Sequence, residues 1–178
     1  MSGPLQNVGS EPDALAPLKV TVAPNGARRS QEDHSQIPVK VNEIVECAQQ
    51  CWDAGAHEIH LHVRDANGGH SLSVELYQQA IEAIKERVPE MGVQITTEAV
   101  GIYSVEEQFA LLKALKPAAA SIAIRESMRT PELVPSLYAL AQEADIQVQH
   151  ILYSHADLAV LRELLDTGMI PDTMRDVL

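Results

Sequence analysis

The sequence predicts an α/β domain in which parallel strands alternate with helices. Five short runs rich in apolar residues are each followed by a stretch with helical periodicity. Helix-capping residues stand at the start of most of these stretches, and Gly, Pro and Asn separate the units. Alternation at this pitch is typical of a parallel sheet with crossover helices.

Two architectures fit this alternation: an open doubly wound sheet, and part of a (β/α)8 TIM barrel. The sequence has no Gly-x-Gly-x-x-Gly pattern after the first strand and no P-loop. The nucleotide-binding form of the open sheet therefore loses its best support, and the residues alone leave the choice open.

Each expected strand is an apolar run that ends where turn residues or polar residues begin. These runs lie at 18–23, 57–63, 92–96, 119–124 and 146–152. The first ends in the turn signal Pro24-Asn25-Gly26, and a polar loop over 27–40 follows it. The last ten residues do not make another full unit, so we expect about five strand-helix units.

Each expected helix is placed by apolar residues three and four apart and by a capping residue at its start. The expected helices cover 42–54 and then begin at Ser71 or Ser73, Ser104, Thr130 and Ser154. Ser104 and Glu107 form a capping box, and Thr130 precedes a proline at the first helical position. Gly55 is a C-cap for the first helix, and the last helix ends near Gly168.

Length and composition limit the possible functions. The 178 residues suffice for one domain, and residues 1–17 are expected to be a disordered N-terminal tail before a domain over 18–178. The net charge of −12 argues against a nucleic-acid partner, and no apolar run is long enough for a membrane span. Cys47 and Cys51 are expected to pack as reduced thiols, which favours a cytoplasmic protein.

The segment from His57 to Asp65 carries the most chemistry. Its apolar residues alternate with His60, His62 and Arg64, which is strand periodicity, so the two imidazoles share one face about 6.5–7 Å apart along the strand. Two imidazoles at this spacing can converge on one metal ion. The alternative is two polar residues on the wet face of a half-buried strand. Helical patterns on both sides favour a covered strand, where buried imidazoles need partners.

Polar residues also follow the other predicted strands. Asn25 and Arg28 follow the first, Thr96 ends the third, and Ser121 lies within the fourth. In a barrel, the carboxyl ends of the strands build the active site. The alternative is that these are ordinary solvated loops and helix caps. That alternative fits Thr96 and Ser121 less well, because both stand inside apolar strands.

Three segments of the sequence resemble the β-keto acid cleavage enzymes, also called 3-keto-5-aminohexanoate cleavage enzymes. They are Val22-Ala23-Pro24-Asn25-Gly26-Ala27-Arg28, Gly55-Ala56 with Ile59-His60-Leu61-His62-Val63-Arg64-Asp65, and Gln94-Ile95-Thr96-Thr97. The His-x-His-x-Arg phrase after a Gly-Ala pair is the specific part. The resemblance covers residues 18–178.

The resemblance implies a zinc-dependent (β/α)8 barrel that condenses a β-keto acid with acetyl-CoA and yields acetoacetate and a new acyl-CoA. By this match, His60 and His62 are zinc ligands, and the metal acts as a Lewis acid on the keto acid. Thr96 and Ser121 match catalytic, substrate-binding hydroxyls. The resemblance also places Asn25, Arg28 and Arg64 among the substrate-binding residues. For the full-length form we expect a homo-oligomer and only small-molecule substrates as partners.

The sequence departs from the family in two ways. Arg28 stands where the aminohexanoate enzymes carry a glutamate, which favours a neutral or acidic substrate. The chain holds about five of eight units, and the family's third zinc ligand, a late glutamate, has no counterpart. We therefore expect a truncated, inactive barrel fragment. Its inward face, with Val22, Ile95 and Ile122, would lose the strands that bury it, so the chain would self-associate.

Two other functions stay open on the sequence. One is a different metal-assisted aldol or Claisen-type barrel enzyme that uses the same His-x-His site on another substrate. The other is a non-catalytic remnant that binds metal or a partner subunit. The missing glutamate favours the remnant, and the extent of the resemblance favours the keto acid enzyme.

Overall fold

A computed structural model describes residues 18–177, so the tail expected at 1–17 lies outside the described residues. The molecule is built on one six-stranded sheet with the order β1-β2-β5-β6-β7-β8. Every neighbouring pair in it is parallel. The strands are β1 Thr21–Val22, β2 Glu58–Leu61, β5 Gly92–Thr96, β6 Ala119–Ala123, β7 Gln147–Ile151 and β8 Asp176–Val177. Strand order follows chain order, as in a (β/α)8 barrel, so the predicted partial barrel is confirmed.

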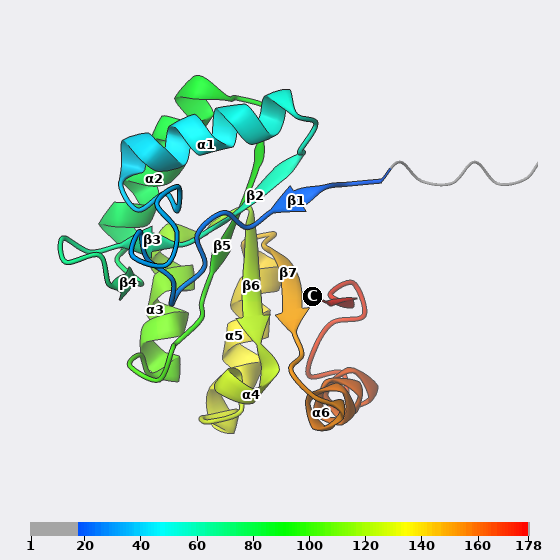
Figure 1. The fold of residues 1–178 in the computed structure, drawn as a ribbon. Helices are drawn as coiled ribbons and strands as arrows, with labels where there is room; N and C mark the ends of the chain where they lie inside the picture. The colour runs from blue at the N-terminus through cyan, green and yellow to red at the C-terminus, as the bar shows by residue number, and fades with distance from the viewer. Residues whose placement is uncertain (1–17, 178) are drawn as a thin grey trace, which may run out of the picture.

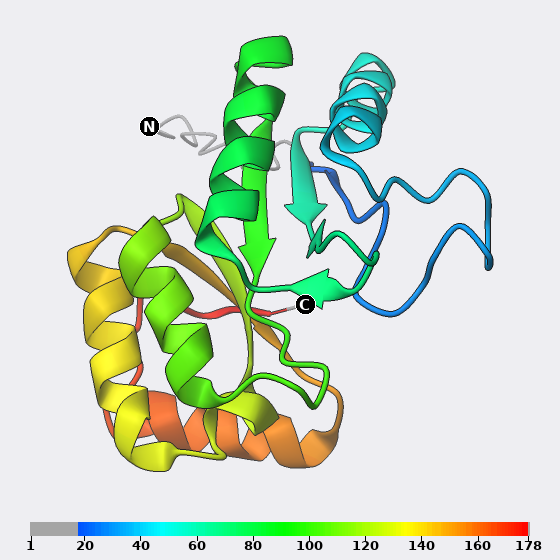
Figure 2. The same cartoon turned by 90° about the vertical axis from the view of Figure 1, so that its left-hand side faces the viewer.

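The helices form one layer over the sheet, and neighbours in the chain pack against each other (Figure 1). Figure 2 shows α2, α3 and α5 in front of the strands. The helices are α1 Val41–Asp53, α2 Val74–Arg87, α3 Val105–Leu115, α4 Ile124–Ser127, α5 Val134–Glu143 and α6 His155–Asp166. None of the helices within 18–177 combines the length and the hydrophobicity needed to cross a bilayer.

Most of the predicted helix starts are confirmed by their capping contacts. The hydroxyls of Ser73, Ser104 and Ser154 accept backbone N–H groups of the first turns of α2, α3 and α6. Thr130 is the exception, because its side chain makes no capping bond. A 3-10 turn, η1 Pro131–Leu133, comes first there and leads into α5.

The structure adds two elements that the sequence did not predict. The expected strand at 57–63 divides at His62, and β3 Val63–Arg64 pairs in antiparallel fashion with β4 His70–Ser71. The second addition is β8, which pairs parallel with β7. The three strands β3, β4 and β8 are each only two residues long, which is too short for a periodic pattern.

The hairpin between β3 and β4 turns at the predicted Asn67-Gly68-Gly69 segment. Gly68 has a φ of +80°, where a side chain would be strained. A Cβ on Gly69 would lie 3.1 Å from Asp65 Oδ2, so the close approach of that carboxylate also favours glycine. Asp65 Oδ1 accepts the backbone N–H groups of Asn67 and Gly69, both at 2.8 Å.

The two faces of the sheet differ in polarity. The face under the helices is apolar and includes Ile59, Leu61, Ile95, Ile122 and Val148, all buried in one core with helix residues. The opposite face is polar and carries Glu58, His60, Gln94, Thr96, Ser121 and Gln149. Strand side chains alternate between faces, so the polar residues of β2, β5 and β6 alternate with residues of the apolar face.

This alternation corrects one prediction. Ile95 and Ile122 do not face the inside of the barrel, since both are buried in the core that the helices cover. Val22 packs against the same core. The inward positions of β5 belong to Gln94 and Thr96 instead. The expectation of an apolar inward face was therefore wrong, and the concave side of the sheet is lined by polar groups.

His150 of β7 is a fully buried imidazole on the helix side of the sheet. Its Nδ1–H donates to the carbonyl of Asp176 at 3.1 Å, and its Nε2 accepts the Tyr138 hydroxyl at 2.9 Å. Burial lowers the pKa of His150 below its ordinary value of 6.5. The neutral ring thus joins α5 to the strand pair β7–β8.

We predict that this ring makes the fold acid-sensitive. Below pH ~6.5 the unfolded chain protonates residue 150 while the folded protein does not, so the free energy of unfolding falls as the pH drops. Above that pH both states are neutral and the effect vanishes. Urea unfolding between pH 7.5 and 5 measures it. His150→Gln should flatten the profile, and His155→Gln, which changes an exposed histidine of α6, is the control. An unchanged slope in His150→Gln contradicts the assignment.

Candidate functional site

The carboxyl ends of three neighbouring strands bring together four of the predicted site residues. His60 and His62 come from the end of β2, Thr96 ends β5, and Ser121 lies in β6. The sheet register pairs His60 with Gln94, two residues before Thr96, and pairs Thr96 with Ser121. All four side chains therefore belong to the polar face. They are also buried, with exposed fractions of 8% or less.

His60 and His62 meet through their Nε2 atoms, which are 3.1 Å apart. The ring centroids are 5.0 Å apart and the rings lie edge to face. The strand spacing placed both rings on one face, and their orientations close the remaining distance. A contact this short between two ring nitrogens needs one proton between them or a shared electrophile.

The proton on His60 is placed by a chain of side-chain amides. Gln149 Nε2 contacts the Val177 carbonyl at 3.4 Å, Gln94 Nε2 contacts Gln149 Oε1 at 3.0 Å, and His60 Nδ1 contacts Gln94 Oε1 at 2.6 Å. The chain starts at a backbone carbonyl, which can only accept. Each amide must therefore donate toward that carbonyl and accept on its other side. His60 then carries its proton on Nδ1, and its Nε2 is a bare lone pair.

The electrostatics of the pair keep both rings neutral. Burial is the main reason that the pKa of His60 lies below its ordinary value. Burial, with His60 and His70 close by, lowers the pKa of His62 to about 2. A neutral imidazole is the form that can donate a lone pair to a metal. Within residues 18–177 no group of three or more His, Cys, Asp or Glu side chains is arranged around one point.

The hydroxyls of Thr96 and Ser121 bond to each other. Ser121 Oγ donates to Thr96 Oγ1 at 3.1 Å, and Thr96 Oγ1 also accepts the backbone N–H of Glu98 at 3.0 Å. Both residues are completely buried. Among the hydrogen bonds within 18–177, Thr96 Oγ1 only accepts, so its own proton can be donated to a further oxygen.

Arg64 and Asn25 hold the chain around the histidine pair. Arg64 donates to the carbonyls of four residues in the loop after β1: Asn25, Gly26, Ala27 and Arg29. The Asn25 amide donates to the carbonyls of His62 at 2.8 Å and Pro38 at 3.1 Å, and its Oδ1 is buried without a partner. In this structure the guanidinium of Arg64 is therefore engaged by the loop and holds it in place.

Arg28 lies in the same loop, and its guanidinium pairs with Glu98 Oε1 at 2.7 Å. The Arg28 side chain is 68% exposed and the Glu98 side chain 10%. Glu98 comes directly after β5 and Arg28 follows β1, so the pair bridges two strand ends on either side of β2. The predicted substrate-binding arginine is therefore already neutralised by a carboxylate at the rim.

Sequence reasoning missed three polar residues that the structure places at the histidine pair. Gln94 stands between Val93 and Ile95, and that period-two pattern marks it as a residue of the polar face. The signal is weaker for Gln149, because His150 follows it in β7. His70 follows a turn and has no periodic signal. It reaches the site because β4 pairs with β3, which puts its ring centroid 5.3 Å from that of His62.

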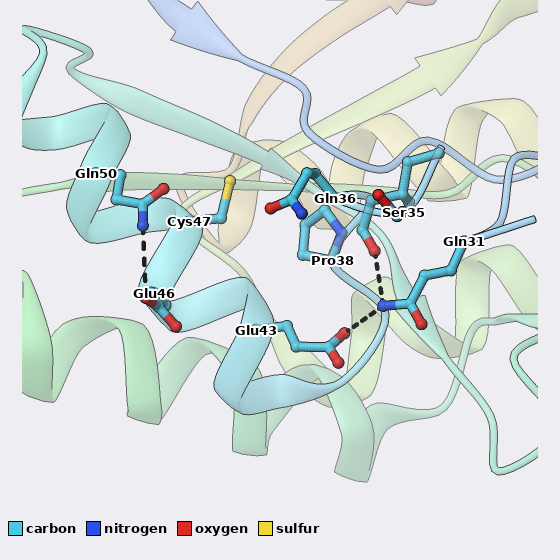
Figure 3. A pocket seen from close by; sticks show the side chains of 9 residues that line it. Gln31, Ser35, Gln36, Pro38, Glu43, Glu46, Cys47 and Gln50 are labelled. Atoms are coloured by element: carbon cyan, nitrogen blue, oxygen red, sulfur yellow. Dashed lines mark hydrogen bonds between the residues drawn. The ribbon is translucent and has the colours of Figure 1, made fainter. Parts of the chain in front are cut away.

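A separate hollow of about 340 Å³ lies between the loop and α1 (Figure 3). The loop contributes Gln31, Ser35 and Gln36, and the helix contributes Glu43 and Cys47. Gln31 Nε2 donates to Glu43 Oε2 at 3.1 Å across it. Cys47 and Cys51 are free thiols with sulfurs 4.0 Å apart. No lining residue comes from a strand end, so this hollow is distinct from the histidine site.

We predict that Arg64→Met destabilises the protein by about 2–4 kcal/mol, because hydrogen bonds to charged groups contribute ~1.5–3 kcal/mol each and are not additive. Four loop carbonyls lose their donor in this variant. Chemical unfolding measures the change. Arg29→Met is the matched control, because the Arg29 side chain pairs only with Asp33 on the surface. Equal stabilities for the two variants would show that Arg64 does not hold the loop.

Comparisons with known proteins agree with this architecture. The family model for the beta-keto acid cleavage enzyme matches residues 17–176. Among solved structures, apo ObcA superposes with a TM-score of 0.63 at 16% identity, over 75% of this chain and 34% of that chain. A type I 3-dehydroquinate dehydratase from Clostridium difficile superposes with a TM-score of 0.59 at 12% identity, over 84% and 59%. At these identities the superpositions show the fold alone.

Curated relatives are similar over part of their length. A 3-keto-5-aminohexanoate cleavage enzyme from Acetoanaerobium sticklandii is 39% identical over 106 residues, which is 59% of this chain and 38% of that protein. A 3-oxoadipate:acetyl-CoA acetyltransferase from Cupriavidus necator is 31% identical over 81 residues, 46% of this chain and 28% of that protein. The chain thus spans well under two thirds of these relatives. With the family model matched over almost its whole length, the chain belongs to the beta-keto acid cleavage enzyme family.

Proposed function

We propose that this chain carries the metal-binding and substrate-orienting half of an enzyme that condenses a β-keto acid with acetyl-CoA to give acetoacetate and an acyl-CoA. The family membership and the names of the curated relatives support this type of reaction. The single observation that carries the proposal is the convergence of the His60 and His62 Nε2 atoms at 3.1 Å, on the polar face and at the strand ends.

The histidine pair fits a divalent zinc ion. Two nitrogens bound to one tetrahedral zinc at ~2.0–2.1 Å stand about 3.3–3.4 Å apart, close to the separation found here. Metal-bound imidazoles usually donate their other N–H to an acceptor, as His60 Nδ1 does to Gln94. Zinc bound there supplies Lewis-acid polarisation of the keto acid oxygens. A catalytic zinc usually has three protein ligands, so a further ligand outside residues 18–177 belongs to the proposal.

Thr96 is proposed to act on the substrate through its hydroxyl proton. Ser121 and the Glu98 amide both donate to Thr96 Oγ1, so that oxygen is fixed and its own proton is directed elsewhere. A buried donor of this kind stabilises negative charge as it develops on a reacting oxygen. Ser121 holds Thr96 in place through its hydroxyl, and the two residues are proposed as the catalytic hydroxyl pair.

Arg28 is proposed to select the substrate class together with Glu98. The 2.7 Å pair leaves no uncompensated cation at the rim, and a substrate anion must compete with Glu98 for the guanidinium. An acidic β-keto acid can make that exchange and a neutral one does not need it, whereas an ammonium group would have to displace Arg28 from Glu98. The 3-oxoadipate named for the Cupriavidus necator relative is an acidic substrate of this kind.

We predict that, in the complete protein that supplies the further zinc ligand, His60→Ala and His62→Ala each lose zinc and abolish acetoacetate formation. Elemental analysis of purified protein gives the metal content, and a coupled assay gives turnover with acetyl-CoA and a panel of β-keto acids. His155→Gln, at an exposed position on α6, should keep both. Full zinc retention in the double alanine variant would refute the metal assignment. Zinc retention in the wild type with no turnover on any substrate would favour a non-catalytic metal-binding protein.

We predict that Arg28→Glu raises kcat/KM for an amino-substituted β-keto acid relative to a neutral one. Two carboxylates, at 28 and at Glu98, would then face the substrate and favour an ammonium group. The ratio of the two kcat/KM values is the readout, so a general loss of activity cancels. Arg29→Glu adds the same charge to the loop and should leave the ratio unchanged. An equal ratio in wild type and Arg28→Glu would rule out a substrate role for Arg28.

A further inference from the structure

His70 is a buried imidazole beside the histidine pair that the proposed reaction leaves without a role. It is 6% exposed, and its ring centroid lies 5.3 Å from that of His62 with the planes tilted by 55°. On its other side, the ring lies edge to face with Tyr103 at 6.0 Å. A buried imidazole has two nitrogens to satisfy, and each unmet polar atom costs free energy.

The tautomer of His70 follows from its one hydrogen bond. Its Nε2 lies 2.7 Å from the backbone carbonyl of Glu98. A carbonyl only accepts, so Nε2 carries the proton and Nδ1 is a bare lone pair in the neutral ring. That Nδ1 is buried and has no hydrogen-bond partner in the structure.

His62 has a matching unpaired atom. His60 Nε2 is bare because the Gln149–Gln94 chain holds its proton on Nδ1. The 3.1 Å contact between the two Nε2 atoms is therefore a hydrogen bond in which His62 supplies the proton. His62 Nδ1 is then bare as well, and it too is buried without a partner among residues 18–177. Two neighbouring imidazoles thus each leave a lone pair unmet.

One change of tautomer gives the two atoms complementary roles. When both Nε2 lone pairs go to a divalent ion, His62 must carry its proton on Nδ1. That Nδ1–H needs an acceptor, and the neighbouring ring of His70 has a bare Nδ1 that needs a donor. The two unpaired atoms then become a donor and an acceptor, and no further proton is taken up or released.

We propose that His70 is a positioning residue that accepts the Nδ1–H of His62 and so fixes the metal-binding tautomer of that ligand. This inference rests on the metal ion of the proposed function. It gives each of the two ligands its own orienting partner, Gln94 for His60 and His70 for His62. Such outer partners typically change metal affinity about 10–100-fold when they are removed.

The surroundings of His70 hold its ring in place for this role. The Asp65 side chain fixes the turn that precedes it through the backbone of Asn67 and Gly69. Tyr103 donates its hydroxyl to the His70 carbonyl at 3.2 Å. The register of the hairpin pairs His70 with Arg64, which is itself anchored to the loop after β1. The acceptor atom is therefore presented by backbone that is fixed on both sides.

Two amide variants separate positioning from a purely structural role. The Gln side chain can place its NH2 near the position of His70 Nε2, which keeps the bond to the Glu98 carbonyl but removes the acceptor at Nδ1. The Asn side chain can place its carbonyl oxygen near Nδ1, which keeps an acceptor but gives up the Glu98 bond. His70→Gln should weaken Zn²⁺ binding about 10–100-fold with little loss of stability. His70→Asn should bind Zn²⁺ more tightly than His70→Gln although it is less stable.

Competition with a chromophoric chelator measures the affinity for Zn²⁺ alone, and urea unfolding of the metal-free full chain measures stability. The ¹⁵N NMR shifts of the imidazoles give a readout that needs no turnover. In the wild type, Zn²⁺ should move the His62 proton from Nε2 to Nδ1 while His70 stays protonated on Nε2. His155→Gln is the control for loss of a histidine and should match the wild type.

The outcomes separate the two proposals. If the wild type binds Zn²⁺ and His70→Gln binds it within twofold, the role of His70 is overturned and the metal site stands. The role is also overturned if zinc affinity in the two amide variants follows stability, with His70→Asn weaker. If the wild type binds no Zn²⁺, the metal in the proposed function fails and the role of His70 falls with it. A His62 proton that stays on Nε2 in the zinc-loaded protein contradicts the inference directly.

Discussion

The candidate site depends on the direction of one series of hydrogen bonds, which holds the proton of His60 on Nδ1 and leaves its Nε2 atom bare. A backbone carbonyl on β8 can only accept a hydrogen bond. This fixes the orientation of the Gln149 amide, then that of the Gln94 amide, and finally the position of the proton on His60. The result is a bare nitrogen at the strand end, facing a second imidazole. This series of hydrogen bonds runs from β8 through β7 and β5 to β2. The protonation of one side chain therefore depends on the assembly of the whole sheet.

This series of hydrogen bonds can form because one face of the sheet is polar while the other is apolar. In a two-layer α/β protein one sheet face packs under helices, and here it carries the isoleucines and leucines of the core. The concave face carries amides, imidazoles and hydroxyls that satisfy each other: His60 with Gln94, Gln94 with Gln149, and Ser121 with Thr96. Buried polar groups need such partners, and a network in which each amide has a defined direction also holds the groups rigidly.

Loop anchoring is the second requirement of the site. The long segment between β1 and α1 has few apolar residues to pack, so its position depends on hydrogen bonds to its backbone. Arg64 supplies four of them from β3, and Asn25 ties the same loop to the His62 carbonyl. The conformation of the loop and that of the ligand-bearing segment are thus linked. Arg28, which the loop carries to the rim, reaches Glu98 only because of this anchoring.

Much of the fold was predictable from local signals. Alternating apolar runs and helical stripes gave the five main strands and their helices, and serine caps gave the starts of α2, α3 and α6. These signals are local because side-chain periodicity repeats within one strand or helix and capping acts within one helical turn. The strands β3, β4 and β8 are two residues long, which is too short for a periodic pattern. They are defined only by pairing, β3 with β4 across a turn and β8 with β7.

For the site, the sequence by itself determined that His60 and His62 share a face and that Thr96 and Ser121 stand inside strands, because strand side chains alternate with a period of two. The tertiary structure decided which face is which, and it placed Ile95 and Ile122 under the helices. It also decided that Arg64 holds a loop, that Arg28 meets Glu98, and that His70 lies against His62. The first two contacts join residues 38 and 70 positions apart, and the third crosses a turn, so only the folded structure brings these groups together.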